Sequence, residues 1–204
     1  MDLTRRSVMA SAFAVGLAAT LPSMAFAQKL PLGTLSQYLN GLQTAQGAFT
    51  QVNADGSVST GTIYIKRPGR VRFEYAPPEK TMVIAGGGQL AVFDARSDEP
   101  TRYPLRETPL SIILADNVNL GRANMVTGHT VDGPTTKVRA QDPENPEYGS
   151  IDLVFTGNPV QLRQWVINDG QGGSTTVILG DLQIGGRVPE RLFNIRAEMR
   201  DWAN

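Results

Sequence analysis

The chain has 204 residues, of which 41% are hydrophobic and 19% charged, and its 19 basic residues balance its 19 acidic ones. A near-neutral chain offers no electrostatic case for binding nucleic acid or for docking on anionic lipid. The absence of cysteine excludes disulfides, a thiol nucleophile and a cysteine-ligated metal.

The first 27 residues have the pattern of a secretory signal peptide. Arg5 and Arg6 precede an apolar run over residues 8–21, and residues 25–27 form a small-x-small cleavage site. The run is too short to span a bilayer, and both the general and the twin-arginine export routes fit it. We expect removal of residues 1–27 and one exported domain over residues 28–204, with a net charge of −1. Gln28 stands where a lipoprotein carries its acylated cysteine, so we expect no lipid anchor.

Two short stretches have helical periodicity. In the first, Thr34 and Gln37 fit a capping box, and apolar residues recur at spacings of three and four: Leu35, Tyr38, Leu39 and Leu42. In the second, Thr108 is the expected cap, Pro109 opens the helix, and an apolar stripe follows: Leu110, Ile113 and Leu114. Both helices are short and apolar on one side, so we expect them to cover an apolar surface.

The rest of the chain alternates with a period of two between tight turns, which predicts an antiparallel meander. The expected strands span residues 49–52, 60–67, 71–75, 81–85, 90–95, 125–131, 136–140, 150–155, 162–168 and 175–179. A sheet of ten or eleven strands tends to curl or close. The fold class is therefore mainly β: one curved antiparallel sheet that forms an incomplete barrel, with the two helices as its lid.

Residues 66–75 place an arginine on an apolar face. Pro68-Gly69 has the composition of a turn, and a residue before proline favours extended geometry, so Arg67 is expected to end a strand. Counting back by two, Arg67 shares a face with Ile65 and Ile63. After the turn, Val71, Phe73 and Tyr75 continue that apolar face. A guanidinium is therefore expected at its rim.

Catalytic chemistry has little support in the sequence. His129, the one histidine, lies in a predicted strand, there is no Gly-x-Ser-x-Gly elbow, and the carboxylates fall on loops and outward strand positions. We therefore expect no enzyme, no cofactor and no metal.

The remaining possibility is binding by apolar side chains. We expect one apolar cavity, open to acyl chains or apolar peptide, lined by Leu42, Phe49, Ile63, Ile65, Val71, Phe73, Tyr75, Met82, Ile84, Val92, Leu110, Ile113 and Leu114. From the residues alone, an ordinary barrel core fits the same pattern equally well.

The order and spacing of several short motifs resemble the LolA family of periplasmic outer-membrane lipoprotein carriers. The resemblance covers nearly the whole chain after residue 27 and rests on Phe49-Thr50-Gln51, Gly61, Lys66-Arg67-Pro68, Phe73, Tyr75-x-x-Pro78, Phe93-Asp94, Thr108-Pro109-Leu110, Trp165 and Asp169-x-Gln171-Gly172. It implies an incomplete antiparallel barrel with a helical lid. The chain departs from the family at Arg70 and Val71, where bulkier apolar residues are common.

The resemblance implies a periplasmic, monomeric chaperone that takes triacylated lipoproteins from an inner-membrane ABC complex and delivers them to an outer-membrane receptor. It also implies that Arg67 latches the lid through Leu39, and that Phe73 is an aromatic residue of the cavity. An alternative keeps the fold and changes the role: an exported sensor that binds lipid or lipoprotein without transporting it.

Overall fold

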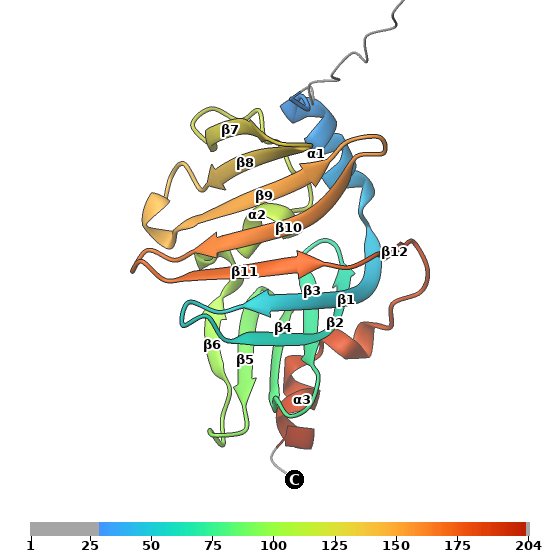
Figure 1. Cartoon of the computed structure of the whole chain (residues 1–204). Helices are drawn as coiled ribbons and strands as arrows, with labels where there is room; N and C mark the ends of the chain where they lie inside the picture. The colour runs from blue at the N-terminus through green and yellow to red at the C-terminus, as the bar shows by residue number, and fades with distance from the viewer. Residues whose placement is uncertain (1–28, 203–204) are drawn as a thin grey trace, which may run out of the picture.

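The computed structural model describes residues 29–202, so the expected signal peptide lies outside the described residues (Figure 1). Three α-helices, α1 (Leu32–Gly41), α2 (Leu110–Leu114) and α3 (Ile195–Trp202), accompany three 3-10 helices, η1 (Leu105–Glu107), η2 (Pro146–Tyr148) and η3 (Glu190–Phe193). The strands are β1 (Thr44–Val52), β2 (Val58–Lys66), β3 (Arg70–Tyr75), β4 (Thr81–Gly86), β5 (Gln89–Asp94), β6 (Thr101–Pro104), β7 (Val126–Asp132), β8 (Thr135–Gln141), β9 (Ser150–Thr156), β10 (Gln161–Asn168), β11 (Ser174–Leu179) and β12 (Gln183–Ile184).

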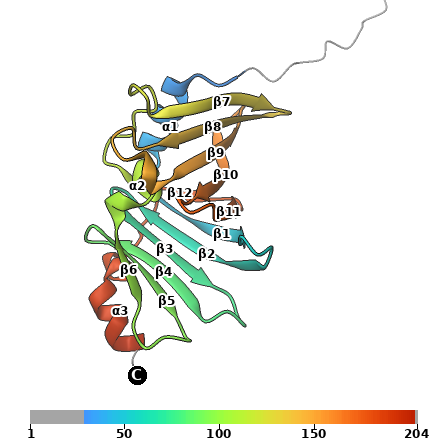
Figure 2. The same ribbon diagram turned by 90° about the vertical axis from the view of Figure 1, so that its left-hand side faces the viewer.

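All twelve strands belong to one antiparallel sheet. Its order is β6-β5-β4-β3-β2-β1-β11-β10-β9-β8-β7, with β12 paired to β1. The edge strands β6 and β7 do not pair with each other, so the sheet curves without closing (Figure 2). This confirms the predicted mainly β, incomplete barrel. The expected count of ten or eleven strands falls short by the short strands β6 and β12.

The path of the chain puts α2 between the two halves of the sheet. Strands β1 to β6 run outward to one edge, and residues 105–125 then cross to the other edge, where β7 begins. This crossing segment carries α2, whose Leu110, Ile112, Ile113 and Leu114 are all buried. Figure 2 shows α2 where the two halves diverge. Four of the five residues of α2 are apolar and buried, so the helix must be surrounded by other apolar groups. The crossing segment therefore fills the inside of the curved sheet.

The inner face of the sheet and the two helices share one core, which we call the inner cluster. It includes Leu35 and Leu39 of α1, the four apolar residues of α2, and inward side chains from both halves of the sheet, among them Phe49, Ile63, Phe73, Leu153, Phe155 and Trp165. Tyr38 of α1 packs edge-on against Phe155 of β9, with ring centroids 6.0 Å apart. We call α1 and α2 the lid helices.

The caps of the lid helices differ from expectation. Helix α1 begins at Leu32 after Pro31, and α2 begins at Leu110 after Pro109, both without a side-chain cap. The Thr108 hydroxyl instead donates to the Leu105 carbonyl at 2.8 Å, within the preceding 3-10 turn. Proline before the first turn already fixes the entry of each helix, so neither predicted threonine cap is needed.

A second, smaller core lies on the opposite face, and we call it the outer cluster. Met82, Ile84, Ala91 and Phe93 of β4 and β5 are covered there by Ile195, Met199 and Trp202 of α3. Phe93 and Trp202 have ring centroids 5.3 Å apart. Helix α3 therefore shields the outside of the sheet, away from the lid helices (Figure 1).

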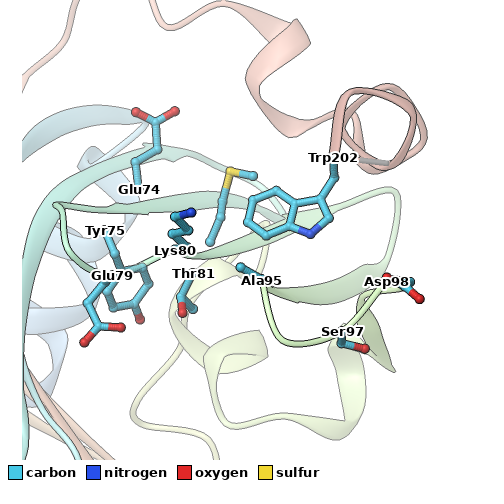
Figure 3. A pocket seen from close by; sticks show the side chains of 10 residues that line it. Glu74, Tyr75, Glu79, Lys80, Thr81, Ala95, Ser97, Asp98 and Trp202 are labelled. Carbon is cyan, nitrogen blue, oxygen red and sulfur yellow. The ribbon is translucent and has the colours of Figure 1, made fainter. Parts of the chain in front are cut away.

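A pocket of about 610 Å³ lies beside the outer cluster, with Trp202 over it (Figure 3). Its rim carries Glu74, Glu79, Lys80 and Asp98. This pocket belongs to the outside of the sheet and does not reach the lid helices.

Asp152 on β9 makes folding sensitive to acid. Its side chain is 3% exposed, and it accepts hydrogen bonds from Arg139 at 2.6 and 2.8 Å while Lys137 lies 3.1 Å away. Burial acts to raise the pKa of Asp152, but the hydrogen bonds and charges of Arg139 and Lys137 outweigh it and hold the pKa below the usual 3.8.

A carboxyl with a depressed folded-state pKa stabilises the protein above its unfolded pKa, and that stability is lost as the pH falls. We expect the free energy of unfolding to decrease as the pH falls below about 4. The Asp152→Asn variant should be less stable at pH 7 and show a weaker acid dependence, measured by urea unfolding across pH. An acid dependence equal to that of wild type would contradict this role.

Candidate lid latch and inner apolar face

Arg67 connects the sheet to both lid helices. It follows β2 directly, its backbone N–H donates to the Gln43 carbonyl at 2.8 Å, and its side chain is only 5% exposed. The guanidinium donates through Nη1 to the Leu39 carbonyl of α1 and through Nη2 to the Ala115 carbonyl that follows α2. A third contact joins Nη2 to Asn40 Oδ1 at 3.3 Å. The predicted pairing of Arg67 with Leu39 is thus present in the geometry.

The acceptors of Arg67 follow from helix geometry. The last carbonyls of a helix have no partner within the helix and carry a partial negative charge. Leu39 lies in the last turn of α1, and Ala115 is the C-cap of α2. One guanidinium therefore satisfies the ends of two helices, one before the first strand and one in the crossing segment, and we call this arrangement the Arg67 clasp.

The turn after Arg67 adds a backbone contact to the same place. The N–H of Gly69 donates to the Leu114 carbonyl at 2.8 Å. Gly69 has a φ of +71°, in the left-handed region that favours glycine. The turn between β2 and β3 is thus attached to α2 by its backbone as well as by Arg67.

Asn40 connects α1 to the part of the crossing segment that follows α2. Its Oδ1 accepts from the Val118 N–H at 2.8 Å, and its Nδ2 donates to the Val118 carbonyl at 2.9 Å. Nearby, the Leu120 N–H donates to Ser36 Oγ at 3.0 Å. The sequence gives no signal for this role of Asn40, because an asparagine near a helix end before glycine is typical of an ordinary C-terminus.

We expect Asn40→Ala to loosen the lid. The substitution leaves the Val118 N–H and carbonyl without their side-chain partner, at a cost of about 1–3 kcal/mol if they stay buried. Hydrogen exchange should show faster exchange of the Val118 amide, while amides of β9 and β10 keep their protection. Unchanged exchange at Val118 would contradict the prediction.

Burial lowers the pKa of the Arg67 guanidinium, and the negative charge of Asp116 acts in the opposite direction. Its Nε–H is buried and has no hydrogen-bond partner among the described residues.

Most of the predicted lining residues do meet on one face. Nine of the expected lining residues belong to the inner cluster, and so does Leu39, the expected partner of Arg67: the nine are Leu42, Phe49, Ile63, Ile65, Val71, Phe73, Leu110, Ile113 and Leu114. Tyr75 packs against this cluster, and its hydroxyl donates to Gln51 Oε1 at 2.6 Å. Burial raises the pKa of Tyr75 to about 12, although the hydrogen bond to Gln51 acts to lower it. Val92 lies opposite Val83, which also packs against the inner cluster.

The expected inner position of Met82 and Ile84 is wrong. Both belong to the outer cluster beneath α3. In the β3–β4 pairing, Phe73 lies opposite Val83 and Val71 opposite Ala85, so Val83 and Ala85 are the inward residues of β4. Strand β4 is apolar on both faces, because α3 covers its outer side, and alternation alone does not tell the faces apart.

An aromatic group forms the centre of the inner face. Phe49 makes edge-to-face contacts with Phe73 at 5.3 Å and with Tyr75 at 5.1 Å, and Phe73 lies 6.3 Å from Trp165. Gly61 pairs with Phe49, and a Cβ at Gly61 would lie 2.7 Å from the Phe49 ring and 2.1 Å from the Glu74 carbonyl. Glycine there lets the Phe49 ring lie across β2. Trp165 joins β10 to this group, so both halves of the sheet contribute.

A pocket of about 600 Å³ borders the inner cluster beside α2. Leu90 and Leu110 of the inner cluster line it, together with Tyr103 of the edge strand β6, and residues 147–148, 167 and 169–171 from the other half of the sheet. This pocket therefore lies where the two halves of the sheet face each other, next to α2.

Comparison with known proteins places these features in a family. Residues 40–196 match the family model described as outer membrane lipoprotein carrier protein LolA. The chain belongs to the LolA family. The match includes Arg67, both sides of its turn, α2 and all strands of the sheet.

Curated relatives carry the same description. An outer-membrane lipoprotein carrier protein of Methylococcus capsulatus is 31% identical over 176 residues, covering 82% of this chain and 84% of the relative. One from Pseudomonas putida is 26% identical over 210 residues and covers 92% of each. One from Coxiella burnetii is 31% identical over 118 residues, and that match spans about half of each protein, 55% of this chain and 52% of the relative.

Among residues 29–202, no helix has the length and apolar character needed to cross a membrane. The same residues contain no group of three or more histidine, aspartate or glutamate side chains arranged to hold a metal ion.

Proposed function

We propose that this protein is a periplasmic carrier that shelters the acyl chains of lipoproteins on the inner face of its sheet and delivers them to the outer membrane. The observation that carries the proposal is the Arg67 clasp, which joins the ends of the two helices that cover the inner face, in a chain of the LolA family. The proposed partners are triacylated lipoproteins, an inner-membrane ABC complex that releases them, and an outer-membrane receptor. The carrier acts as a monomer and performs no catalysis.

The inner face has the chemistry that acyl chains require. The inner cluster brings together aliphatic and aromatic side chains from both halves of the sheet, so an acyl chain bound there would contact apolar surface. Burying an acyl chain contributes about 0.8 kcal/mol per methylene, and therefore roughly 12 kcal/mol as an upper bound for a chain of about sixteen carbons. Shelter is easily provided, and release is the harder part of the task.

The lid helices resolve this difficulty. In the closed structure, side chains of α1 and α2 occupy the inner face that cargo would cover. Cargo must therefore displace the lid helices and break the hydrogen bonds of Arg67. Charge-assisted hydrogen bonds are worth about 1.5–3 kcal/mol each. When lipoprotein leaves, the clasp forms again, and its hydrogen bonds offset part of the free energy lost as the acyl chains leave the inner face. The closed state therefore lowers the apparent affinity for lipoprotein and favours its transfer to the receptor.

Co-purification tests the proposal. The tagged protein is expressed in a Gram-negative host with a triacylated lipoprotein and recovered from the periplasmic fraction, and bound species are identified by mass spectrometry. We expect a soluble complex that contains the lipoprotein with all three acyl chains. Recovery of free lipid alone, or of a single regulatory protein without lipoprotein, would contradict the carrier and support a sensor that uses the same sheet.

A further inference from the structure

Arg67 differs from the other buried charges in what surrounds it. Among the residues that the structure describes, the charged side chains less than a tenth exposed are Arg67, Arg72 and Asp152. Arg72 lies 2.6 Å from Glu74 and 2.7 Å from Glu198, and Asp152 lies 2.6 Å from Arg139 and 3.1 Å from Lys137. Arg67 has no carboxylate within ion-pair distance in the described part of the chain, and it is held only by two carbonyls and an amide oxygen.

The hydrogen bonding of Arg67 is also incomplete. Four of its five N–H groups belong to the two terminal nitrogens, which make the lid contacts, whereas the buried Nε–H has no acceptor among the described residues. A buried donor without a partner is costly, and so is a buried cation that no carboxylate contacts, although the charge of Asp116 acts on Arg67 from beyond ion-pair distance. The site can therefore gain from a ligand that brings an anionic oxygen.

The apolar surroundings of Arg67 specify the rest of that ligand. Arg67 directly follows β2, which carries Ile63 and Ile65 of the inner cluster, and Phe73 of the aromatic group lies opposite Ile63. A ligand that pairs with the guanidinium and fills the inner face needs a negatively charged head on a single acyl chain.

We infer that this protein has a second ligand class, single-chain anionic amphiphiles, and that Arg67 is the counter-ion for their head group. The carboxylate of a fatty acid matches the guanidinium fork with two parallel hydrogen bonds and takes the place of the lid carbonyls. Binding of such a ligand opens the clasp and competes with lipoprotein for the inner face. The inference uses the interior assigned under the proposed function, but the preference for an anionic head does not depend on lipoprotein transport.

Isothermal titration of the delipidated protein with ligands that share one chain and differ in head group tests the inference. Dodecanoate, 1-dodecanol and dodecylamine, each below its micelle concentration, provide an anionic, a neutral and a cationic head. We expect dodecanoate to bind about tenfold or more tightly than dodecanol, the range of a charge-assisted hydrogen bond, and dodecylamine to bind no better than dodecanol. Dodecyl phosphate tells apart two anionic head groups, phosphate and carboxylate. If it binds more tightly than dodecanoate, the natural ligand carries a phosphate; if it binds more weakly, the natural ligand carries a carboxylate.

Variants separate the charge of Arg67 from its effect on the lid. Arg67→Leu should bind dodecanoate and dodecanol about equally, whatever its absolute affinity, whereas Arg67→Lys keeps the charge and should keep the preference. Arg70→Leu removes the neighbouring arginine, which pairs with Glu190 at 2.8 Å, and should behave as wild type. Equal binding of dodecanoate and dodecanol by wild type, or an unchanged preference in Arg67→Leu, would overturn the inference.

A lipoprotein-binding assay on the same preparations separates the two proposals. Lipoprotein binding without a carboxylate preference would overturn the inference and leave the carrier function standing. A carboxylate preference without lipoprotein binding would overturn the carrier function and support the inference.

Discussion

The Arg67→Leu variant is expected to take up lipoprotein normally and to release it about ten- to a hundredfold more slowly than wild type. The variant loses two charge-assisted hydrogen bonds, to the Leu39 and Ala115 carbonyls, and the loss of even one of them, about 1.5–3 kcal/mol, corresponds to that range. Opening becomes easier, so loading does not suffer. Release becomes slower because the empty carrier no longer gains the free energy of closing its lid, so the loaded state is favoured more strongly than in wild type.

Transfer kinetics measure this effect. Purified carrier loaded with lipoprotein is mixed with receptor or acceptor membranes, and the fraction of lipoprotein transferred is followed in time. Arg70→Leu is the matched control, because Arg70 lies in the same turn, is partly exposed and pairs with Glu190 outside the lid. If Arg67→Leu transfers lipoprotein as fast as wild type, the Arg67 clasp does not control release. Equally slow transfer by Arg70→Leu would also contradict this role.

Removal of residues 195–204 is expected to lower the free energy of unfolding by about 3–5 kcal/mol, the range of losing several partly buried apolar side chains. The deletion removes Ile195, Met199 and Trp202, which exposes Met82, Ile84 and Phe93 on the outer face. It also removes Glu198, one of the two carboxylates that pair with the buried Arg72.

Urea unfolding measures the loss. The contacts of the clasp should survive the deletion because α3 packs on the outer cluster, whereas Arg67 joins the lid helices. Hydrogen exchange at the lid amides of the deletion variant, in native buffer, tests this second part. Arg196→Ala is the control, since Arg196 lies exposed on the same helix and should change stability by less than about 0.5 kcal/mol. A deletion variant as stable as wild type would show that α3 does not maintain the outer cluster.

Much of the inner face could be predicted because period-two alternation is unambiguous where the outer face is polar. Strand β2 alternates Ile63 and Ile65 with polar neighbours, so the side of Arg67 follows by counting. The same rule fails in β4, where Met82 and Ile84 are as apolar as Val83 and Ala85. Only the presence of α3 explains why both faces are buried.

Helix α3 is absent from the elements expected from the sequence, although its apolar residues have helical periodicity. Ile195, Met199 and Trp202 recur at spacings of four and three, a short apolar stripe among charged residues. The helix has eight residues and no buried residue of its own, so the stripe is too brief to stand out from a polar C-terminal segment. Strand β12 has two residues, which is below the length at which alternation can be recognised.

The hydrogen bonds of the lid could not be deduced from sequence, because they depend on where helices end in space. Counting placed Arg67 on the correct face, and the family resemblance supplied Leu39 as its partner. The Ala115 carbonyl and the link from Asn40 to Val118 arise only when the crossing segment brings the end of α2 beside the end of α1. The role of these contacts in transport stays a prediction.

The most direct test of a carrier whose cargo lies on the inner face is photo-crosslinking from two matched positions. Phe73 and Phe93 are both buried phenylalanines, the first in the inner cluster and the second in the outer cluster. Each is replaced in turn by a photoreactive phenylalanine analogue, and the loaded carrier is irradiated with lipoprotein that carries labelled acyl chains. We expect acyl crosslinks from position 73 and none from position 93. Crosslinks from position 93, or from neither position in a loaded complex, would contradict it.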